Sequence, residues 1–339
     1  MPRLPLGKLP GDLLQSILDK HAPRDSRVVV GPRVGEDAAV IDIGDRYLVA
    51  TSDPITFATD ELGWYALHVN ANDIVVRGAT PRWFLATLLL PAGTTDEASV
   101  RALFGQLAEA CEDAEVALVG GHTEITYGLD RPIVAGTMLG EVDKDKLVTS
   151  SGARVGDAIV LTKGVPLEGA AIIAREKESE LRARGVPPAT IRKAKGFLRA
   201  PGISVRPEAE IACELSRVHA MHDPTEGGIA TALHELADAA GVGLRIDRDR
   251  IMVLPEGQRL CDAFGLDPLG TIASGALVMT LNPADAGVVI HALARESIDC
   301  HFIGQVVDRA QGRMLVEGTK SWPLPIFPQD EITRLFAEA

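Results

Sequence analysis

The stretch HAMHDPTEGGIATALHEL, residues 219–236, decides how the second half of the chain folds. Asp223 is a candidate helix N-cap, Pro224 suits the first helical position, and Glu226 stands at the spacing of a capping box. Apolar residues then recur at helical spacing and predict a buried face. Gly227 and Gly228 fall within the predicted first turns, where each costs about 1 kcal/mol relative to alanine. We therefore expect this helix start to have a role that excludes side chains.

The composition is that of a globular protein long enough for two domains. Of 339 residues, 46% are hydrophobic and 24% are charged. The net charge of −13 argues against binding to nucleic acids or to membrane surfaces, which are themselves anionic. Any phosphate group would have to be bound locally, through main-chain amides, a few basic side chains and a divalent metal.

Cysteine usage and the N-terminus predict a cytoplasmic protein. The four cysteines lack the spacing of a metal site or a disulfide framework, and we expect them to be reduced core residues: Cys111, Cys213, Cys261 and Cys300. The opening MPRLPLGKLPGDLL is not a signal-peptide pattern. The apolar stretch at 83–93 is about half of the ~20 residues that a membrane span needs.

The order of predicted elements is that of two α/β domains. In the first half we predict strands at 27–30, 38–43, 46–52, 82–90, 115–119 and 132–139, with helices at 63–78 and 96–114. In the second half we predict strands at 158–162, 243–247 and 275–281, with helices near 207–217, 226–240, 255–264 and 284–294. The boundaries expected are 1–150 for the N-terminal domain, 151–320 for the C-terminal domain and 321–339 for a tail. Residues 176–202 are charged and read as a solvated excursion.

Four further stretches combine acidic or amide side chains with glycine. In GPRVGEDAAVID, residues 31–42, Gly35 precedes Glu36 and Asp37, although such a turn is equally common on surfaces. Asp53 follows a predicted strand, where a turn-forming Asp-Pro looks the same. Both are weak signals by themselves.

The predicted helix in ALHVNANDIVVRGATP, residues 66–81, carries a more unusual pattern. Asn70 and Asp73 share one face, and His68 and Asn72 form a second polar pair on an otherwise apolar helix. A functional role is favoured here over a scaffold role. Arg77 has two readings, as a partner for a phosphate or for a neighbouring carboxylate.

The stretch VALVGGHTEITYG, residues 116–128, places two glycines at the end of a predicted strand. Gly120 and Gly121 would allow a ligand to approach the backbone, and strand ends often carry active sites. His122 and Glu124 follow, but a tight turn with exposed polar residues fits equally well. Because no glycine pattern matches a P-loop or a Rossmann fingerprint, these acids favour Mg²⁺ bound together with substrate phosphates.

These motifs, in this order, resemble the aminoimidazole ribonucleotide (AIR) synthase superfamily. The matching pieces are GEDAAVI, SD, NAND…GATP, GGHTE and DPTEGG, and they extend from about Gly31 to about Val307. The second half is similar to the hydrogenase maturation factor HypE, whereas the first half is similar to thiamine-monophosphate kinase. The resemblance implies an α/β (α+β) fold of two PurM-like domains, in which N-terminal strands pair with those of a second subunit in a dimeric β-barrel.

The resemblance also implies the site. ATP and Mg²⁺ would bind through metal ligands Asp37, Asp53 and Asp73. Residues expected to contact the nucleotide or its phosphates are Gly35, Asn70, Asn72, Gly120, Gly121, Gly227 and Gly228. Apart from the resemblance, Lys8 is a candidate for reaching a phosphate from the N-terminus, and an ordinary exposed lysine is the favoured alternative. Candidate catalytic residues are His122, Glu124 and Asp223.

The expected activity is that of a HypE-like enzyme, which uses ATP to phosphorylate an amide-type or thiocarboxamide-type oxygen of a small or protein-borne acceptor. Expected partners are a second copy of the chain and maturation proteins, with no nucleic acid and no membrane. HypE carries a terminal cysteine, whereas the last cysteine here, Cys300, lies in a predicted core strand. A carrier thiol in the tail is therefore not expected. A thiamine-monophosphate-type kinase and a non-catalytic nucleotide-binding maturation partner remain alternatives.

Overall fold

The computed structural model describes residue 4, residues 6–21 and residues 25–336. The chain forms two compact units. The smaller unit contains residues 25–31 and 37–147, and the larger unit contains residues 32–36, residues from 148 onward and the described residues up to 21. The division after Leu147 lies near the expected position 150, but helix α1 and residues 32–36 belong to the larger unit rather than to an N-terminal domain.

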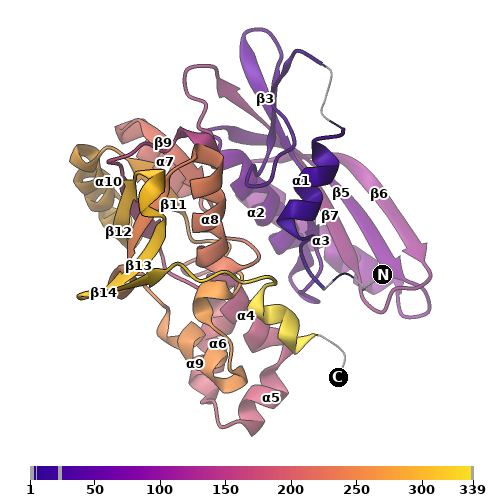
Figure 1. Cartoon of the computed structure of the whole chain (residues 1–339). Coiled ribbons are helices and arrows are strands. Elements are labelled where there is room, and N and C mark those ends of the chain that lie inside the picture. Colours follow the sequence, from indigo (N-terminus) through magenta and orange to yellow (C-terminus); the bar gives the residue numbers. More distant parts are fainter. Residues whose placement is uncertain (1–3, 5, 22–24, 337–339) are drawn as a thin grey trace. The chain divides into compact units, whose positions relative to one another are not determined.

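The smaller unit is a sheet with two helices. Its elements are β1 (Val28–Val30), β2 (Ala39–Asp42), β3 (Arg46–Thr51), β4 (Pro54–Ile55), α2 (Leu62–Val75), β5 (Thr80–Pro91), α3 (Glu97–Asp113), β6 (Ala117–Thr126) and β7 (Ile133–Asp143). The strand order is β1-β2-β3-β7-β5-β6, with β4 beside β7. Helix α2 packs on β5 and β7 and against α3 (Figure 1). Apart from β4, which was not predicted, and β6, these elements lie within a few residues of the predicted ones.

Strand β6 differs from the prediction. The predicted strand ended at residue 119, with a tight turn at the glycines as the alternative reading, whereas β6 continues through Thr126 in parallel pairing with β5. The register shifts between Phe84 and Leu85, where Val119 has no partner, and Gly120 and Gly121 then pair with Leu85 and Ala86. A bulge absorbs the extra residue, so the glycines lie inside the strand rather than after it.

The larger unit is built on a second seven-stranded sheet. Its strand order is β14-β13-β10-β12-β8-β11-β9. Its strands are β8 (Ala158–Thr162), β9 (Val218–His222), β10 (Gly243–Asp247), β11 (Val278–Leu281), β12 (Cys300–Val307), β13 (Arg313–Glu317) and β14 (Lys320–Pro323). Its helices are α1 (Gly11–Leu18), α4 (Leu167–Glu176), α5 (Glu178–Ala183), α6 (Pro188–Lys195), α7 (Arg206–Leu215), α8 (Gly228–Ala240), α9 (Pro255–Phe264) and α10 (Pro283–Arg295). Short 3-10 turns connect them, of which η4 (Pro268–Gly270) and η6 (Glu331–Leu335) bear on the site.

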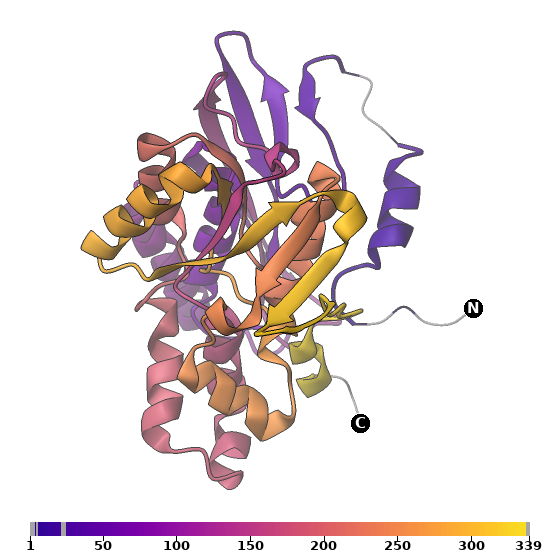
Figure 2. The ribbon, with the colours of Figure 1, turned by 60° about the vertical axis from the view of Figure 1, so that its left-hand side comes forward.

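Residues 176–202 are not a solvated excursion. They form α5, α6 and a 3-10 turn, and α6 packs on α4 and α9. The side chains of Leu181, Ile191 and Phe197 are buried. Figures 1 and 2 show α4, α5, α6 and α9 gathered beyond one end of the strands of this unit. The charged residues mark the outer face of a helical layer whose inner face is apolar.

The helix predicted in HAMHDPTEGGIATALHEL, residues 219–236, begins later than expected. Helix α8 starts at Gly228, and its N-cap is Gly227 in the left-handed conformation, with φ of 82°. The capping box expected from Asp223 and Glu226 is therefore wrong, because both residues lie in the turn before the helix. The two glycines consequently do not weaken a helix interior.

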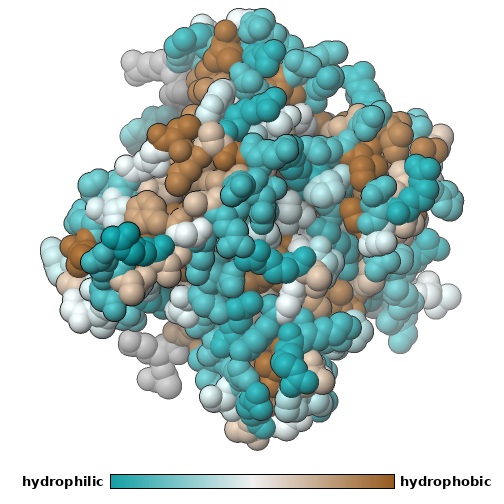
Figure 3. Space-filling model, turned by 180° about the vertical axis from the view of Figure 1, so that it is seen from behind, coloured by the Kyte–Doolittle hydropathy of each residue, from teal (hydrophilic) through white to brown (hydrophobic). Residues whose placement is uncertain are grey.

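Cys111, Cys261 and Cys300 are buried as expected, but Cys213 is exposed. No helix within the described residues is long and apolar enough to span a membrane. Figure 3 shows one face of the molecule, on which hydrophilic side chains predominate and hydrophobic ones form separate groups.

Candidate functional site

Asp37 and Arg77 form an ion pair in the smaller unit. The Arg77 Nη2 donates a hydrogen bond to Asp37 Oδ2 over 2.8 Å. The Arg77 side chain is fully buried and that of Asp37 is 11% exposed. Of the two readings for Arg77, the structure shows pairing with a carboxylate. This guanidinium fixes the Asp37 carboxylate and offsets its charge.

Thr51, which the sequence did not single out, joins Asp37 to Asp73. Its Oγ1 lies 2.7 Å from Asp73 Oδ2 and 3.0 Å from the main-chain oxygen of Asp37. Thr51 is the last residue of β3, and Asp73 lies in the last turn of α2. The single hydroxyl proton can be donated to one of these two acceptors at a time. Thr51 thereby places the Asp73 carboxylate beside the main chain of Asp37. The only sequence signal was its position next to Ser52-Asp53 at a strand end.

Asn70 fixes the third candidate ligand through its backbone. The Asp53 amide donates to Asn70 Oδ1 over 2.9 Å, and Asn70 Nδ2 donates to the Asp53 carbonyl over 3.1 Å. Asn70 also donates to the carbonyl of Ala66 over 2.9 Å. Asn70 therefore orients the Asp53 loop while the Asp53 carboxyl takes no part in these bonds.

The polar residues of α2 are buried as a group. His68, Asn70, Asn72 and Asp73 are all at most 6% exposed. Burying polar groups costs free energy unless specific partners compensate it, so a solvent-facing stripe is excluded. Sequence reasoning had favoured a functional role for these four residues because an apolar helix leaves no surface for them.

These carboxylates suit a metal that shares its coordination with a ligand. Among the described residues of the smaller unit, no three Asp, Glu, His or Cys side chains bring their ligand atoms within 4.8 Å of one another. Asp37, Asp53 and Asp73 therefore do not form a closed cage. Mg²⁺ commonly takes one or two carboxylates together with waters and substrate phosphates, and this donor set fits that mode.

Strand β6 presents its polar residues on an open sheet edge. His122 Nε2 lies 3.5 Å from Glu124 Oε2, with the two side chains 66% and 54% exposed. Gly121 has φ of 144°, and a Cβ there would lie 1.9 Å from the Ala86 carbonyl oxygen. His122 and Glu124 alternate with Thr123 along the strand and therefore share one face of it. Gly120 lies on the same face.

In the larger unit, the turn between β9 and α8 is packed so closely by another segment that position 228 requires glycine. A Cβ on Gly228 would lie 2.6 Å from the Leu269 oxygen and 2.7 Å from the Thr271 oxygen. The Ala273 amide also donates to the Pro224 carbonyl over 3.2 Å. The segment 269–273 of the same chain thus packs directly on the turn, and this contact excludes side chains. Asp223, at the start of the turn, is fully buried.

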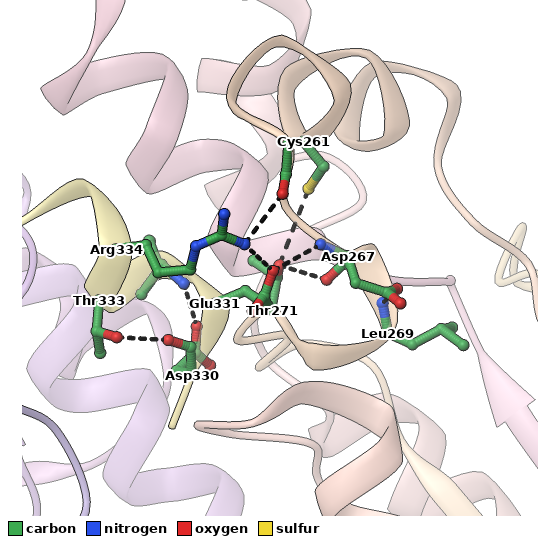
Figure 4. Close-up of polar contacts among 10 residues, drawn as sticks. Cys261, Asp267, Leu269, Thr271, Asp330, Glu331, Thr333 and Arg334 are labelled. Atoms are coloured by element: carbon green, nitrogen blue, oxygen red, sulfur yellow. Dashed lines mark hydrogen bonds and ion pairs between the residues drawn. The ribbon is translucent and has the colours of Figure 1, made fainter. Parts of the chain in front are cut away.

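Further acids lie near this turn and were missed by sequence reasoning. Burial raises the pKa of Glu168 to about 8, and nearby Glu226, Asp330 and Asp223 raise it further, although the Ser274 hydroxyl opposes the shift. Glu168 lies in the first turn of α4, whose Gly169 amide donates to the Ile272 carbonyl over 2.8 Å. Asp330 comes from a segment far along the chain (Figure 4). No sequence pattern connects these residues, because only the fold makes them neighbours.

Lys8 and Gly35 both lie against Glu235 of α8. Lys8 Nζ is 3.7 Å from Glu235 Oε1, and a Cβ on Gly35 would lie 3.2 Å from the Glu235 carbonyl oxygen. Glu235 Oε2 also pairs with His222 Nε2 at 2.9 Å. Lys8 is therefore engaged with a carboxylate of its own unit, the outcome expected for an ordinary lysine.

Comparison with known families identifies the chain. Residues 35–142 match the AIR synthase related protein, N-terminal domain, and residues 154–317 match the AIR synthase related protein, C-terminal domain. The chain belongs to the AIR synthase-related family. This confirms the expected family and the expected pairing of two mixed α/β domains.

Three sequence relatives span nearly all of the chain or most of it. A putative hydrogenase expression/formation protein of Methanocaldococcus jannaschii is 28% identical, covering 94% of this chain and 96% of that protein. The carbamoyl dehydratase HypE of Cupriavidus necator is 29% identical over 84% of this chain and 80% of its own length. A selenide, water dikinase of Pelobacter propionicus is 27% identical over 91% of this chain and 94% of its own. These names support the prediction of an ATP-using enzyme.

Solved structures show the same fold. HypE in its complex with HypF superposes with a TM-score of 0.75 at 20% identity, covering 93% of this chain and 99% of that one. ThiL, complexed with AMPPCP and TMP, gives a TM-score of 0.72 at 20% identity, with coverage of 97% and 99%. Because both likenesses are of similar strength, the fold by itself does not separate the two activities.

Proposed function

We propose that this protein is a Mg²⁺-dependent, ATP-using enzyme of the HypE-like branch, which phosphorylates an amide-type or thiocarboxamide-type oxygen. Similarity over most of the chain to a hydrogenase expression protein and to carbamoyl dehydratases supports this branch. In this reaction the acceptor oxygen attacks the γ-phosphorus and ADP leaves. The phosphorylated oxygen can then depart as phosphate.

The observation that carries the proposal is the buried connection Asp37–Thr51–Asp73. Catalysis of phosphoryl transfer depends mainly on positioning and on electrostatic stabilisation of the phosphoryl group. Thr51 and Arg77 hold the two carboxylates rigidly, and Asn70 holds the loop of Asp53. Mg²⁺ bound by one or two of these carboxylates would neutralise charge on the phosphates of ATP.

The chain is proposed to act as a homodimer through β6. All residues of this edge strand except Thr126 are exposed, including Leu118, Val119 and Ile125. An exposed edge offers unpaired main-chain groups for pairing with another strand. Pairing between two copies would place His122 and Glu124 in an enclosed setting, where they can contact nucleotide or acceptor.

The test is ADP release by the purified full chain with ATP and Mg²⁺, in the presence of a small S-carbamoyl thiol or of thiamine monophosphate. We expect turnover with the S-carbamoyl thiol, dependence on Mg²⁺, and loss of at least 100-fold in Asp73→Asn. Asp45→Asn is the matched control, because the Asp45 side chain is 83% exposed. A cooperative thermal transition must show that Asp73→Asn remains folded.

The alternatives give different outcomes in the same assay. Rapid formation of thiamine diphosphate would replace the HypE-like assignment by the kinase assignment. Tight ATP binding without turnover of either acceptor, also in the presence of a HypF-type partner, would favour a non-catalytic maturation partner. The solved HypE–HypF complex supports including such a partner.

A further inference from the structure

The C-terminal segment, defined as residues 326–336, is attached to the larger unit at several points. Glu331 Oε2 accepts a hydrogen bond from the Asp267 amide over 3.0 Å, and Arg334 Nη1 donates to the Gly265 carbonyl over 3.0 Å (Figure 4). Phe327 covers η4, since a Cβ on Gly270 would lie 2.4 Å from its ring. The segment is thus a packed part of the unit.

At its centre, Asp330 reaches the turn before α8. Asp330 Oδ2 accepts a hydrogen bond from the Gly227 amide over 2.6 Å, and Oδ1 accepts one from the Ile332 amide over 2.8 Å. The Thr333 hydroxyl donates to the Asp330 carbonyl over 2.7 Å. Asp330 is only 4% exposed. The Gly227 amide belongs to the N-cap of α8, where the helix dipole favours a negative group.

The turn from Asp223 to Gly228 is therefore held from two sides. On one side the Ala273 amide donates to the Pro224 carbonyl, and on the other Asp330 accepts from the Gly227 amide. Both neighbours are distant in sequence from the turn. Removing the Asp330 contact would release the end of the turn next to the helix.

We propose that Asp330 is a positioning residue, which fixes the turn that carries Asp223 by accepting the hydrogen bond of the Gly227 amide. The inference rests on the proposed function, with Asp223 as one of its candidate catalytic residues. Asp330 itself acts through the main chain of the turn. The C-terminal segment thereby becomes part of the site's supporting structure.

The protonation of Asp330 gives this contact a pH dependence. Burial raises the pKa of Asp330 to about 7, and Glu226 contributes, while the amides of Ile332, Gly227 and Ile272 oppose the shift. Glu168 of α4 and Cys261 of α9 also face this carboxyl. Burial raises the pKa of Cys261 to about 12, so this thiol stays neutral.

The sign follows from the raised pKa. An Asp330 carboxyl that leaves its buried position returns toward its usual pKa of 3.8 and releases a proton. The Asp330 contribution to attachment of the C-terminal segment is therefore complete at low pH, is lost as the pH rises through about 7, and does not change above that. Glu168 changes the attachment in the same direction up to about pH 8.

The experiment is hydrogen exchange of the full chain, read on peptides covering residues 223–228 and 326–336 and corrected for intrinsic exchange rates. Wild type, Asp330→Ala and Asp330→Asn are compared at pH 5.5, 6.5 and 7.5. We expect Asp330→Ala to exchange at least 10-fold faster in both peptides. Asp330→Asn cannot ionise and keeps one acceptor oxygen for the two amides of Gly227 and Ile332. We expect it to exchange faster than wild type but slower than Asp330→Ala, and to show a smaller pH dependence than wild type.

Asp308→Asn is the matched control, because Asp308 caps a 3-10 turn of the same unit by accepting from the Ala310 amide over 2.8 Å. Activity is read in parallel as ADP release with ATP and Mg²⁺: Asp330→Ala should lose at least 10-fold and Asp330→Asn less than 3-fold. Unchanged exchange at 223–228 in Asp330→Ala, or an identical pH profile in Asp330→Asn and wild type, overturns the inference. Absence of ATP turnover in wild type counts only against the proposed function, since exchange is measured without it.

Discussion

The Arg77 guanidinium is completely buried and donates a 2.8 Å hydrogen bond to the carboxylate of Asp37. Replacing Arg77 with methionine leaves a mostly buried carboxylate without this partner. We expect the free energy of unfolding to fall by about 3–5 kcal/mol, the range found when one partner of a buried ion pair is removed. Urea unfolding of the purified chain measures the change.

The double variant Arg77→Met/Asp37→Asn is the internal control. Removing the Asp37 charge as well should restore at least about 1 kcal/mol of the free energy of unfolding relative to Arg77→Met, because the desolvation penalty of a charge is larger than that of an amide. A double variant less stable than Arg77→Met would contradict the assignment of the loss to an uncompensated charge.

Glu168 gives the larger unit a pH-dependent stability. Its pKa is raised from 4.5 to about 8, mainly by burial. Folded protein therefore holds a proton that the unfolded chain releases between these two values, so the contribution is complete below pH 4.5 and is lost as the pH rises through 8. Relative to Glu168→Gln, wild type should lose roughly 1 kcal/mol per pH unit between pH 5 and 8. Parallel stability curves for the two proteins would disprove this.

Gly228 at the start of α8 and Gly241 at its end have similar backbone conformations, but only Gly228 is closely contacted by another segment. Gly228 and Gly241 both have left-handed φ values, of 61° and 68°, but a Cβ on Gly241 meets nothing within 4 Å. Gly241→Ala should lower the free energy of unfolding by about 1–2 kcal/mol, which is the cost of a left-handed backbone conformation for a residue with a Cβ. Gly228→Ala should cost at least about 2 kcal/mol more, because its Cβ meets two carbonyl oxygens. Equal losses in thermal unfolding would argue against a close approach by residues 269–271.

The exposed edge of β6 predicts the behaviour of the chain in solution. Val119→Lys/Ile125→Lys introduces two charges on side chains that are 54% and 58% exposed, and we expect a dimer to become a monomer in light scattering. Val288→Lys, at an equally exposed position on α10, should leave the mass unchanged. A wild-type chain that is already monomeric at micromolar concentration would refute pairing through β6.

The sequence predicts most elements of the fold because most have strong periodicity. Helices α2, α3, α9 and α10 lie within a few residues of their predicted positions. The end of β6 was misplaced because the prediction stopped the strand before Gly120 and Gly121, and the start of α8 was misplaced because Asp223 and Glu226 were read as a capping box. In both places glycine is required by a neighbouring segment, Ala86 for Gly121 and Leu269–Thr271 for Gly228. Such contacts depend on tertiary structure and leave no local pattern.

The candidate site likewise contains residues that the sequence could single out and residues that it could not. Asn70 and Asp73 could be selected from the sequence because polar residues on an apolar helix are conspicuous, and the structure links them to Asp53 and Thr51. Thr51, Glu168, Glu235 and Asp330 could not. Their importance comes from burial and from partners at long sequence separation, such as the 103 residues between Gly227 and Asp330.

Gly121 also fixes how β5 and β6 align. Sliding β6 by one residue in one direction would bring the His122 side chain against the Ala86 carbonyl, which leaves no room even for a methyl group, whereas sliding it in the other direction would bring Gly120 there. The same slip would reverse the surface from which the His122 imidazole projects. A residue larger than glycine at 121 therefore requires β5 and β6 to separate or to change register at this point, and with a change of register the exposed edge would offer a different set of side chains to a partner.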